Sequence, residues 1–264
     1  MLKFSANLSL LFTERPLIER FATARAAGFS AVEIQFPYEL STADIKAELQ
    51  AHHLELVLIN VPTGDLMQGG DGFAGVPGRQ AEFRSACQQA MDYAQALDVK
   101  RINILSGRQP EGLTREECLA TLGENLHHAA HYFDKAGITP LTEAINIFDM
   151  PRFLVHSLVH MRELCDEIKP LKMQFDCYHL SRMGRDILPA LRGNLQDIAH
   201  IQFADNPGRH EPGTGQIDYA PIFSLLRDSD YPGWCGAEYH PSKKTEDTLA
   251  WLQHFAQTSI PSAH

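Results

Sequence analysis

The chain has 264 residues, a formal net charge of −10 at pH 7 and an ordinary apolar fraction of 44%. A chain of this length can bury a large core without disulfides or metals, as one large domain or two small ones. Its Lys and Arg residues form no cluster that would bind a phosphate backbone, and no apolar run approaches the roughly 20 residues that span a bilayer. Composition therefore predicts neither a nucleic-acid nor a membrane partner.

The cysteines and the N-terminal segment favour the cytoplasm. The five cysteines are scattered and form no C-x-x-C pair, so we expect neither a disulfide framework nor a thiolate zinc site. The N-terminal apolar run is short, is interrupted by Ser5, Asn7 and Ser9, and has no small-residue cleavage site after it, which argues against a signal peptide. A cytoplasmic location is the default prediction, and the sequence leaves a homo-oligomer open.

In chain order, apolar patterning predicts strands that alternate with helices. The predicted strands are 2–7, 31–36, 54–60, 100–107, 138–145, 171–178, 198–205 and 233–239. The predicted helices are 16–27, 42–49, 79–97, 114–136, 151–168, 186–195, 218–229 and 245–257. The first helix begins with Pro16 and ends at Gly28, Thr42 is a candidate N-cap, and Thr114 with Glu117 fits a capping box.

This alternation predicts an α/β fold with a parallel sheet. Eight βα units in a chain of this length match a closed (β/α)8 TIM barrel, formed as one domain over residues 1–264. An open doubly wound sheet is the second choice, and the absence of G-x-G-x-x-G after the first strand weighs against its dinucleotide-binding form. Long loops rich in Gly and Pro follow the third and seventh strands, and loops in such places often carry the chemistry of α/β proteins.

Polar side chains stand near the ends of four consecutive predicted strands. They are Glu143, Asp176, Gln202 and Glu238. One buried carboxylate is ordinarily explained by a partner Arg or a backbone amide, but that explanation is less economical for a set at equivalent places. A barrel would bring them to one mouth, and their oxygen donors favour a divalent metal such as Mg²⁺ or Mn²⁺ over zinc.

Two glutamates that face each other across a metal site suggest proton transfer next to a carbonyl group. Glu143 could take a proton from carbon and Glu238 could return one to the neighbouring carbon, while the metal stabilises the developing negative charge. This is the chemistry of an aldose–ketose isomerase.

Other polar residues have weaker functional interpretations. His179 could bind a substrate hydroxyl or cap its loop, with neither favoured. Arg209 could bind a substrate carboxylate, although solvated loop arginines are common. His127 and His131 have a spacing compatible with a metal, but a solvated helix face is the better interpretation.

Several segments resemble bacterial hydroxypyruvate isomerases, which belong to the xylose isomerase-like barrel superfamily. They are FSANLSLLF, FPYE, VPGR, EAINIFDMP, QFDCYHLSRM, HIQFADNPGRHEPGTGQIDY and GWCGAEYHP. The resemblance implies interconversion of hydroxypyruvate and 2-hydroxy-3-oxopropanoate (tartronate semialdehyde), with Glu143 and Glu238 as the proton-transfer pair. It also implies a divalent metal held by Glu143, Asp176, Gln202 and Glu238. One departure is Ala144, where the family pattern has Pro.

Alternatives from other classes remain. The related 2-oxo-tetronate isomerases act on a four-carbon acid, and the loops decide between the two substrates; the segments INIFDMP and ADNPGRHEPGTG are more similar to the hydroxypyruvate enzymes. A metal-dependent endonuclease of the same superfamily would need a basic face and a His-rich zinc cluster. The few His residues at predicted strand ends and the net charge of −10 weigh against it. A catalytically inert sugar-binding barrel is the third alternative, and no residue favours it.

Overall fold

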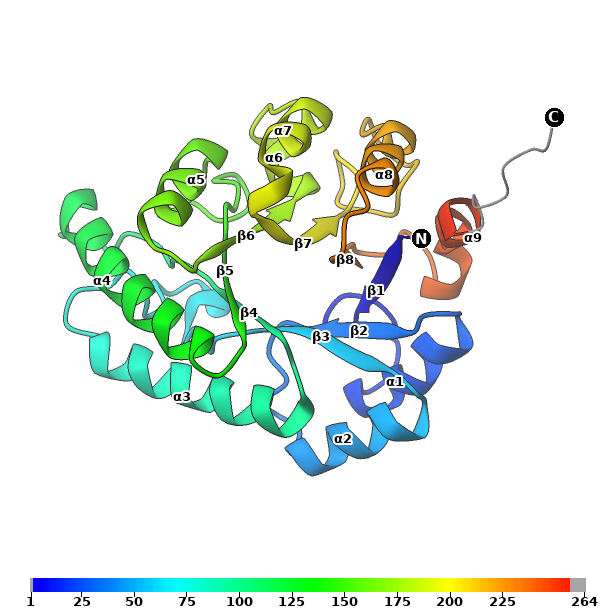
Figure 1. Cartoon of the computed structure of the whole chain (residues 1–264), viewed down its shortest axis with the longest axis horizontal. Coiled ribbons are helices and arrows are strands. Elements are labelled where there is room, and N and C mark those ends of the chain that lie inside the picture. Colours follow the sequence, from blue (N-terminus) through cyan, green and yellow to red (C-terminus); the bar gives the residue numbers. More distant parts are fainter. Residues whose placement is uncertain (1, 257–264) are drawn as a thin grey trace.

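The structure, a computed structural model, describes residues 2–256, in which eight parallel strands close into a barrel (Figure 1). Each strand pairs with its neighbour in sequence, and β1 pairs with β8 to close the ring. The strands are β1 Lys3–Asn7, β2 Ala31–Ile34, β3 Glu55–Asn60, β4 Arg101–Ile104, β5 Thr139–Glu143, β6 Lys172–Asp176, β7 Ile198–Phe203 and β8 Trp234–Ala237. The predicted barrel is confirmed, and the open doubly wound sheet is wrong.

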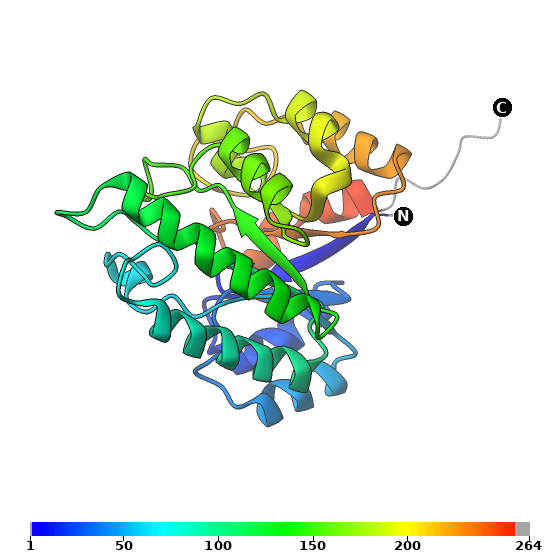
Figure 2. The same cartoon turned by 60° about the vertical axis from the view of Figure 1, so that its left-hand side comes forward.

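Helices surround the barrel, and α3 and α4 run side by side along its outside (Figures 1 and 2). The α-helices are α1 Leu17–Ala26, α2 Thr42–Ala51, α3 Gln80–Leu97, α4 Arg115–Asp134, α5 Leu158–Glu167, α6 Cys177–Arg182, α7 Ile187–Asn194, α8 Tyr219–Asp228 and α9 Ala250–Ala256. Short 3₁₀ helices are η1 Leu66–Gln68, η2 Leu195–Asp197 and η3 Thr245–Thr248. Within residues 2–256, no helix is both long and apolar enough to cross a membrane.

The helix signals in the sequence are mostly confirmed. Gly28 follows α1 with a φ of 99°, a conformation that glycine adopts without a Cβ penalty. Thr114 and Glu117 form the full capping box at the start of α4. The N-cap of α2 is Ser41 rather than Thr42, because the Ser41 side chain accepts a hydrogen bond from the backbone N–H of Asp44.

Most predicted elements are shorter in the structure, and in three of them part of the predicted element has a different conformation. The predicted helix 151–168 begins only at Leu158, because its first part instead pairs through Phe153 with Arg108. The predicted strand 171–178 stops at Asp176, and α6, which the sequence analysis missed, follows at once. The predicted helix 245–257 is η3 followed by α9, and its last residue, Gln257, lies outside the described residues.

The barrel has a polar interior and an apolar outer layer. On β7, Ile201 and Phe203 face the helices, and the Phe203 ring lies 5.0 Å from that of Trp251 and 5.4 Å from that of Phe223. The alternate residues His200 and Gln202 point inwards and bond side chains of other strands. The period of two along a strand thus separates the hydrophobic core from a buried polar network.

Candidate active site

The four strand-end residues lie at one rim of the barrel. Glu143 and Asp176 are the last residues of β5 and β6, and Glu238 directly follows β8. In the strand register Asp176 lies beside Gln202, and Gln202 lies beside Gly236 on β8. All four side chains are buried. The barrel therefore brings together residues that are up to 95 positions apart in the sequence, as expected for strand ends.

Glu143 is surrounded by amide donors and by other acids. Its Oε2 accepts hydrogen bonds from Asn103 Nδ2 at 3.0 Å and from Gln174 Nε2 at 2.9 Å. Burial raises the pKa of Glu143 well above its usual value, and the charges of Asp176 and Glu238 raise it further. The same burial and neighbouring negative charges would favour a cation between these carboxyl groups.

Glu238 lies at the centre of a second set of hydrogen bonds. Its Oε1 accepts from Asn7 Nδ2 at 3.0 Å, Gln35 Nε2 at 2.8 Å and Gln202 Nε2 at 3.2 Å. Its Oε2 accepts from Arg209 Nη2 at 2.6 Å. Burial raises the pKa of Glu238 to about 7, although the Arg209 charge opposes the rise. A carboxyl group with a pKa of this size can both give and take a proton near neutral pH.

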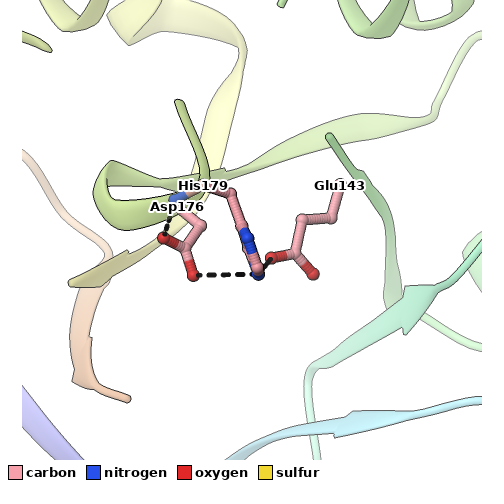
Figure 3. A group of neighbouring side chains, drawn as sticks. All are labelled: Glu143, Asp176 and His179. Atoms are coloured by element: carbon pink, nitrogen blue, oxygen red, sulfur yellow. Dashed lines mark hydrogen bonds and ion pairs between the residues drawn. The ribbon is translucent and has the colours of Figure 1, made fainter. Parts of the chain in front are cut away.

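His179 stands between two of the carboxylates (Figure 3). Its Nε2 lies 4.0 Å from Glu143 Oε1 and 4.0 Å from Asp176 Oδ2. One ligand atom from each of these residues lies within 4.8 Å of the others, so the group could hold a metal ion. The cluster is fixed locally, because the Asp176 side chain caps α6 by accepting the backbone N–H of His179.

The hydrogen bonds of His179 define its tautomer. Asn146 Oδ1 accepts from the backbone N–H groups of Phe148 and Asp149, which turns the Asn146 amide nitrogen towards His179 Nδ1, 2.7 Å away. Nδ1 is then the acceptor and Nε2 carries the proton. Burial lowers the pKa of His179 to about 4, so the ring is neutral at pH 7. In this tautomer His179 offers an N–H to the space between the carboxylates.

These residues face a cavity of about 240 Å³. Glu143, His179, Arg209 and Glu238 contribute to its polar wall. The apolar part of the wall consists of Phe36, Leu66, Met67, Leu105, Ile145 and Met150. The cavity is smaller than the ~300–1,000 Å³ pockets that bind drug-sized ligands, so it fits a small substrate.

Residues 21–255 match a family described as xylose isomerase-like TIM barrel. The chain belongs to this family. It is 42% identical to hydroxypyruvate isomerase of Escherichia coli K12, over 97% of this chain and all of the relative. It is 39% identical to 2-oxo-tetronate isomerase of Cupriavidus necator, over 97% of this chain and 99% of the relative.

Solved structures agree with the family. A protein described as AP endonuclease, family 2, from Brucella melitensis superposes with a TM-score of 0.92 at 39% identity, over 96% of this chain and 99% of that chain. A 3-keto-D-glucoside 4-epimerase from E. coli superposes with a TM-score of 0.79 at 19% identity, over 96% of this chain and 99% of that chain, and this match shows the shared fold alone.

In this xylose isomerase-like barrel, sequence reasoning missed several residues around the site. Asn7, Gln35, Asn103 and Gln174 hold the two glutamates, and Glu33 lies at the bottom of the network. They carry the same signal as the strand-end acids, a polar residue within an apolar strand. Asn7 ends β1 just as Glu143 ends β5, whereas Asn103 and Gln174 lie before the ends of their strands and Gln35 follows β2. His127 and His131 stack on an exposed face of α4, as the preferred interpretation predicted.

Proposed function

We propose that this protein is a sugar-acid isomerase that interconverts hydroxypyruvate and 2-hydroxy-3-oxopropanoate (tartronate semialdehyde). The observation that carries the proposal is the pair of buried carboxyl groups, Glu143 and Glu238, which face one small cavity and have raised pKa values. The near full-length similarity to hydroxypyruvate isomerase of E. coli supports the substrate class. Both compounds are three-carbon acids, and a cavity of about 240 Å³ can enclose them.

We propose further that Glu143, Asp176, Gln202 and Glu238 hold a divalent metal, Mg²⁺ or Mn²⁺. The donor chemistry supports this choice, because three buried carboxylates and an amide oxygen form a hard oxygen site. Arg209 is their counter-charge: it donates a hydrogen bond to Glu238, and its charge also acts on Asp176 and Glu143. With all three carboxyl groups ionised, it leaves two negative charges unbalanced. When bound, the metal would supply electrostatic stabilisation of negative charge on substrate oxygens.

The protein's own groups then have distinct tasks in this proposal. Glu143 takes a proton from C3 of hydroxypyruvate and Glu238 delivers a proton to C2, while the hydroxyl proton on O3 passes to O2. The C2 ketone thereby becomes an alcohol and C3 becomes the aldehyde, and a proton returned from Glu143 to Glu238 completes the cycle. His179 offers its Nε2–H to a substrate oxygen, a role that its tautomer and neutrality support. Arg209 holds Glu238 in place through Nη2 and packs over the Tyr178 ring, 5.1 Å from its centre.

A substrate panel tests the proposal. Wild type is assayed with three- and four-carbon 2-keto acids, each with Mg²⁺, Mn²⁺ or a chelator. We expect turnover of hydroxypyruvate that requires the metal, and loss of turnover in Glu143→Gln, which keeps the size and burial of the side chain. Efficient turnover of only the four-carbon acid would instead identify a 2-oxo-tetronate isomerase, which the 39% identity to the C. necator enzyme also supports.

One similarity favours a different class, because the B. melitensis protein is described as an AP endonuclease. The net charge of −10 disfavours a DNA substrate, because binding to a phosphate backbone needs clustered cations. An incision assay on a duplex with one abasic site decides between the classes. We expect no incision by the metal-loaded protein under conditions in which hydroxypyruvate is converted.

We also propose a cytoplasmic location. All five cysteines are free and buried, which suits a reducing compartment. The test is to locate a fluorescent fusion of the protein in cells by microscopy. Fluorescence in the periplasm or the medium would contradict the proposal.

A further inference from the structure

Arg108 lines the same cavity and has no anionic partner among residues 2–256. We propose that Arg108 is the residue that binds the substrate carboxylate and so selects acids over neutral sugars. The inference rests on the proposed function, because it assumes that the substrate is a 2-keto acid. It assigns to Arg108 the task that the sequence analysis considered for Arg209.

The backbone of Arg108 is fixed from two sides. Its N–H donates to the carbonyl of Asp71, in the loop after β3, at 2.9 Å. On the other side it pairs with Phe153 in an isolated antiparallel bridge, and Gly107 O accepts from the N–H of Leu154 at 2.9 Å. The residue therefore projects from a seam of backbone hydrogen bonds between two loops at the mouth of the barrel.

The guanidinium group is also held in place, but with donors to spare. Its Nη1 donates to the carbonyls of Leu66 at 2.8 Å and Gly70 at 2.6 Å. Both hydrogen bonds use Nη1. Nη2 and Nε have no hydrogen-bond partner among the described residues, and neither is a buried atom. Carbonyl oxygens orient the group without neutralising it. A planar guanidinium with two donors on one edge matches a carboxylate.

The charges around the cavity leave this task to Arg108. Arg209 already faces Glu238, and the charges of Asp176 and Glu143 also act on it. If a divalent cation is bound, it and Arg209 together balance the three buried carboxylates. Asp149, another acid at the cavity, has its own partners in Arg182 and Tyr178. The negative charge of a substrate acid thus needs one more cation.

The surroundings of Arg108 strengthen such a contact. Leu66, Leu105, Ile145 and Phe153 form a small hydrophobic cluster beside the cavity, and Arg108 is bonded to one of its members. An ion pair next to apolar side chains is screened less than one in open water.

The test compares Arg108→Met and Arg108→Lys with wild type, and Arg152→Gln is the matched control. Arg152 lies on the same seam, but it is exposed, pairs with Asp71 and does not line the cavity. The probe is pyruvate, a 2-keto acid without the 3-hydroxyl group, and its dissociation constant is measured by calorimetry on the Mn²⁺-loaded protein. The Mn²⁺ dissociation constant is measured separately, without pyruvate.

We expect Arg108→Met to weaken pyruvate binding, and to raise the KM for hydroxypyruvate, by about 10- to 100-fold, the usual loss for a charge-assisted hydrogen-bonded pair. Arg108→Lys should fall in between, because lysine keeps the charge but not the fork. Mn²⁺ affinity should be unchanged or higher, since a cation has been removed, and Arg152→Gln should behave as wild type.

Two results would overturn the inference. One is wild-type pyruvate affinity in Arg108→Met, and the other is a parallel loss of pyruvate and Mn²⁺ binding, which would indicate a structural role only. Failure of the proposed function looks different, because wild type itself would then neither convert any 2-keto acid nor bind pyruvate.

Discussion

Gly236 in β8 faces the barrel interior at a point where no side chain fits. A Cβ added there would lie 2.2 Å from Glu33 Oε2 and 2.5 Å from Oε1. The Glu33 carboxylate cannot easily move away, because it accepts hydrogen bonds from several buried side chains. These are Ser5 at 3.0 Å, Asn7 at 3.0 Å, His200 at 2.8 Å and Gln202 at 2.8 Å. Gly236→Ala should therefore disrupt either this network or the strand.

The expected cost follows from these two options. Overpacking of a core costs about 1–3 kcal/mol, and separating a buried charge from its partner costs about 3–5 kcal/mol. Because β8 is paired on both sides, to β1 and β7, it has little freedom to shift, and we expect a loss of about 3 kcal/mol in the free energy of unfolding. At roughly 2–4 °C per kcal/mol, the melting temperature should fall by about 6–12 °C.

The assay is thermal unfolding followed by circular dichroism, with Gly123→Ala as the control of opposite sign. Gly123 lies within α4, and a Cβ there would have no neighbour within 4 Å. That variant should gain about 0.4–1 kcal/mol, because alanine restricts the unfolded chain. If Gly236→Ala melted with wild type, the Glu33 carboxylate would not occupy the space beside β8, and the packing argument would be refuted.

The remaining predictions concern the chemistry of the site and the thiols. In D₂O, Glu238→Gln should still exchange the C3 hydrogens of hydroxypyruvate through Glu143 while forming little aldehyde, whereas Glu143→Gln should lose both; NMR of the substrate distinguishes the two, and equal exchange in both variants would remove Glu143 as the base. Chelation should abolish turnover, and Mg²⁺ or Mn²⁺ but not K⁺ should restore it; full activity after exhaustive dialysis against chelator would contradict the metal site. Burial raises the pKa values of the Cys87 and Cys165 thiols to about 12, so the reactive thiolate is scarce at pH 8, and a thiol reagent should label the native protein far more slowly than the urea-unfolded protein.

The strands and the strand-end acids could be predicted because their signal is local. On β7, His200 and Gln202 alternate with apolar residues, and a barrel turns that alternation into an inside and an outside. The barrel rule then places the carboxyl ends of all strands at one rim. Glu143 and Glu238 could therefore be located from the sequence although they come from different quarters of the chain.

The ends of two elements were predicted less well, one because a single residue belongs to both a strand and a helix cap, and the other because of a contact with a distant loop. Asp176 closes β6 and also caps α6, and the apolar residues that follow it continue the pattern of a strand equally well. The first part of the predicted helix 151–168 is held in an extended path by its bridge to Arg108. A contact of this kind depends on a loop from elsewhere in the chain, and local propensity does not report it.

The interior network could not be predicted, because it depends on register between distant strands. In the sequence, Glu33 is a single acidic residue within a strand, and nothing near it indicates its hydrogen-bond partners. Those partners lie between 26 and 169 positions away. Arg108 was missed for the same reason, because its sequence neighbours do not reveal the carbonyls that orient it. Gly236 could not be explained from its own segment either. Only glycine fits there because the Glu33 carboxylate from β2 occupies the space of a Cβ.

The network gives two neighbouring carboxylates opposite properties. Burial alone would raise the pKa of Glu33, but the charge of His200 and the hydrogen bonds from Gln202 and Asn7 outweigh it, and the pKa lies below its usual value. The pKa of Glu238, in contrast, is raised to about 7. When their environments shift the pKa values of two acids in opposite directions, one acid stays charged and the other can exchange protons near neutral pH.

The two acids are also linked mechanically. Asn7 and Gln202 each donate one amide hydrogen to Glu33 and another to Glu238. A flipped amide would place its oxygen between two carboxylates, so the charge of Glu33 fixes the orientation of both amides. In Gln202 this orientation turns the amide oxygen towards Gln174, the residue that also bonds Glu143. Glu33 thereby aligns the donors on both sides of the proposed proton transfer, although it does not itself line the cavity.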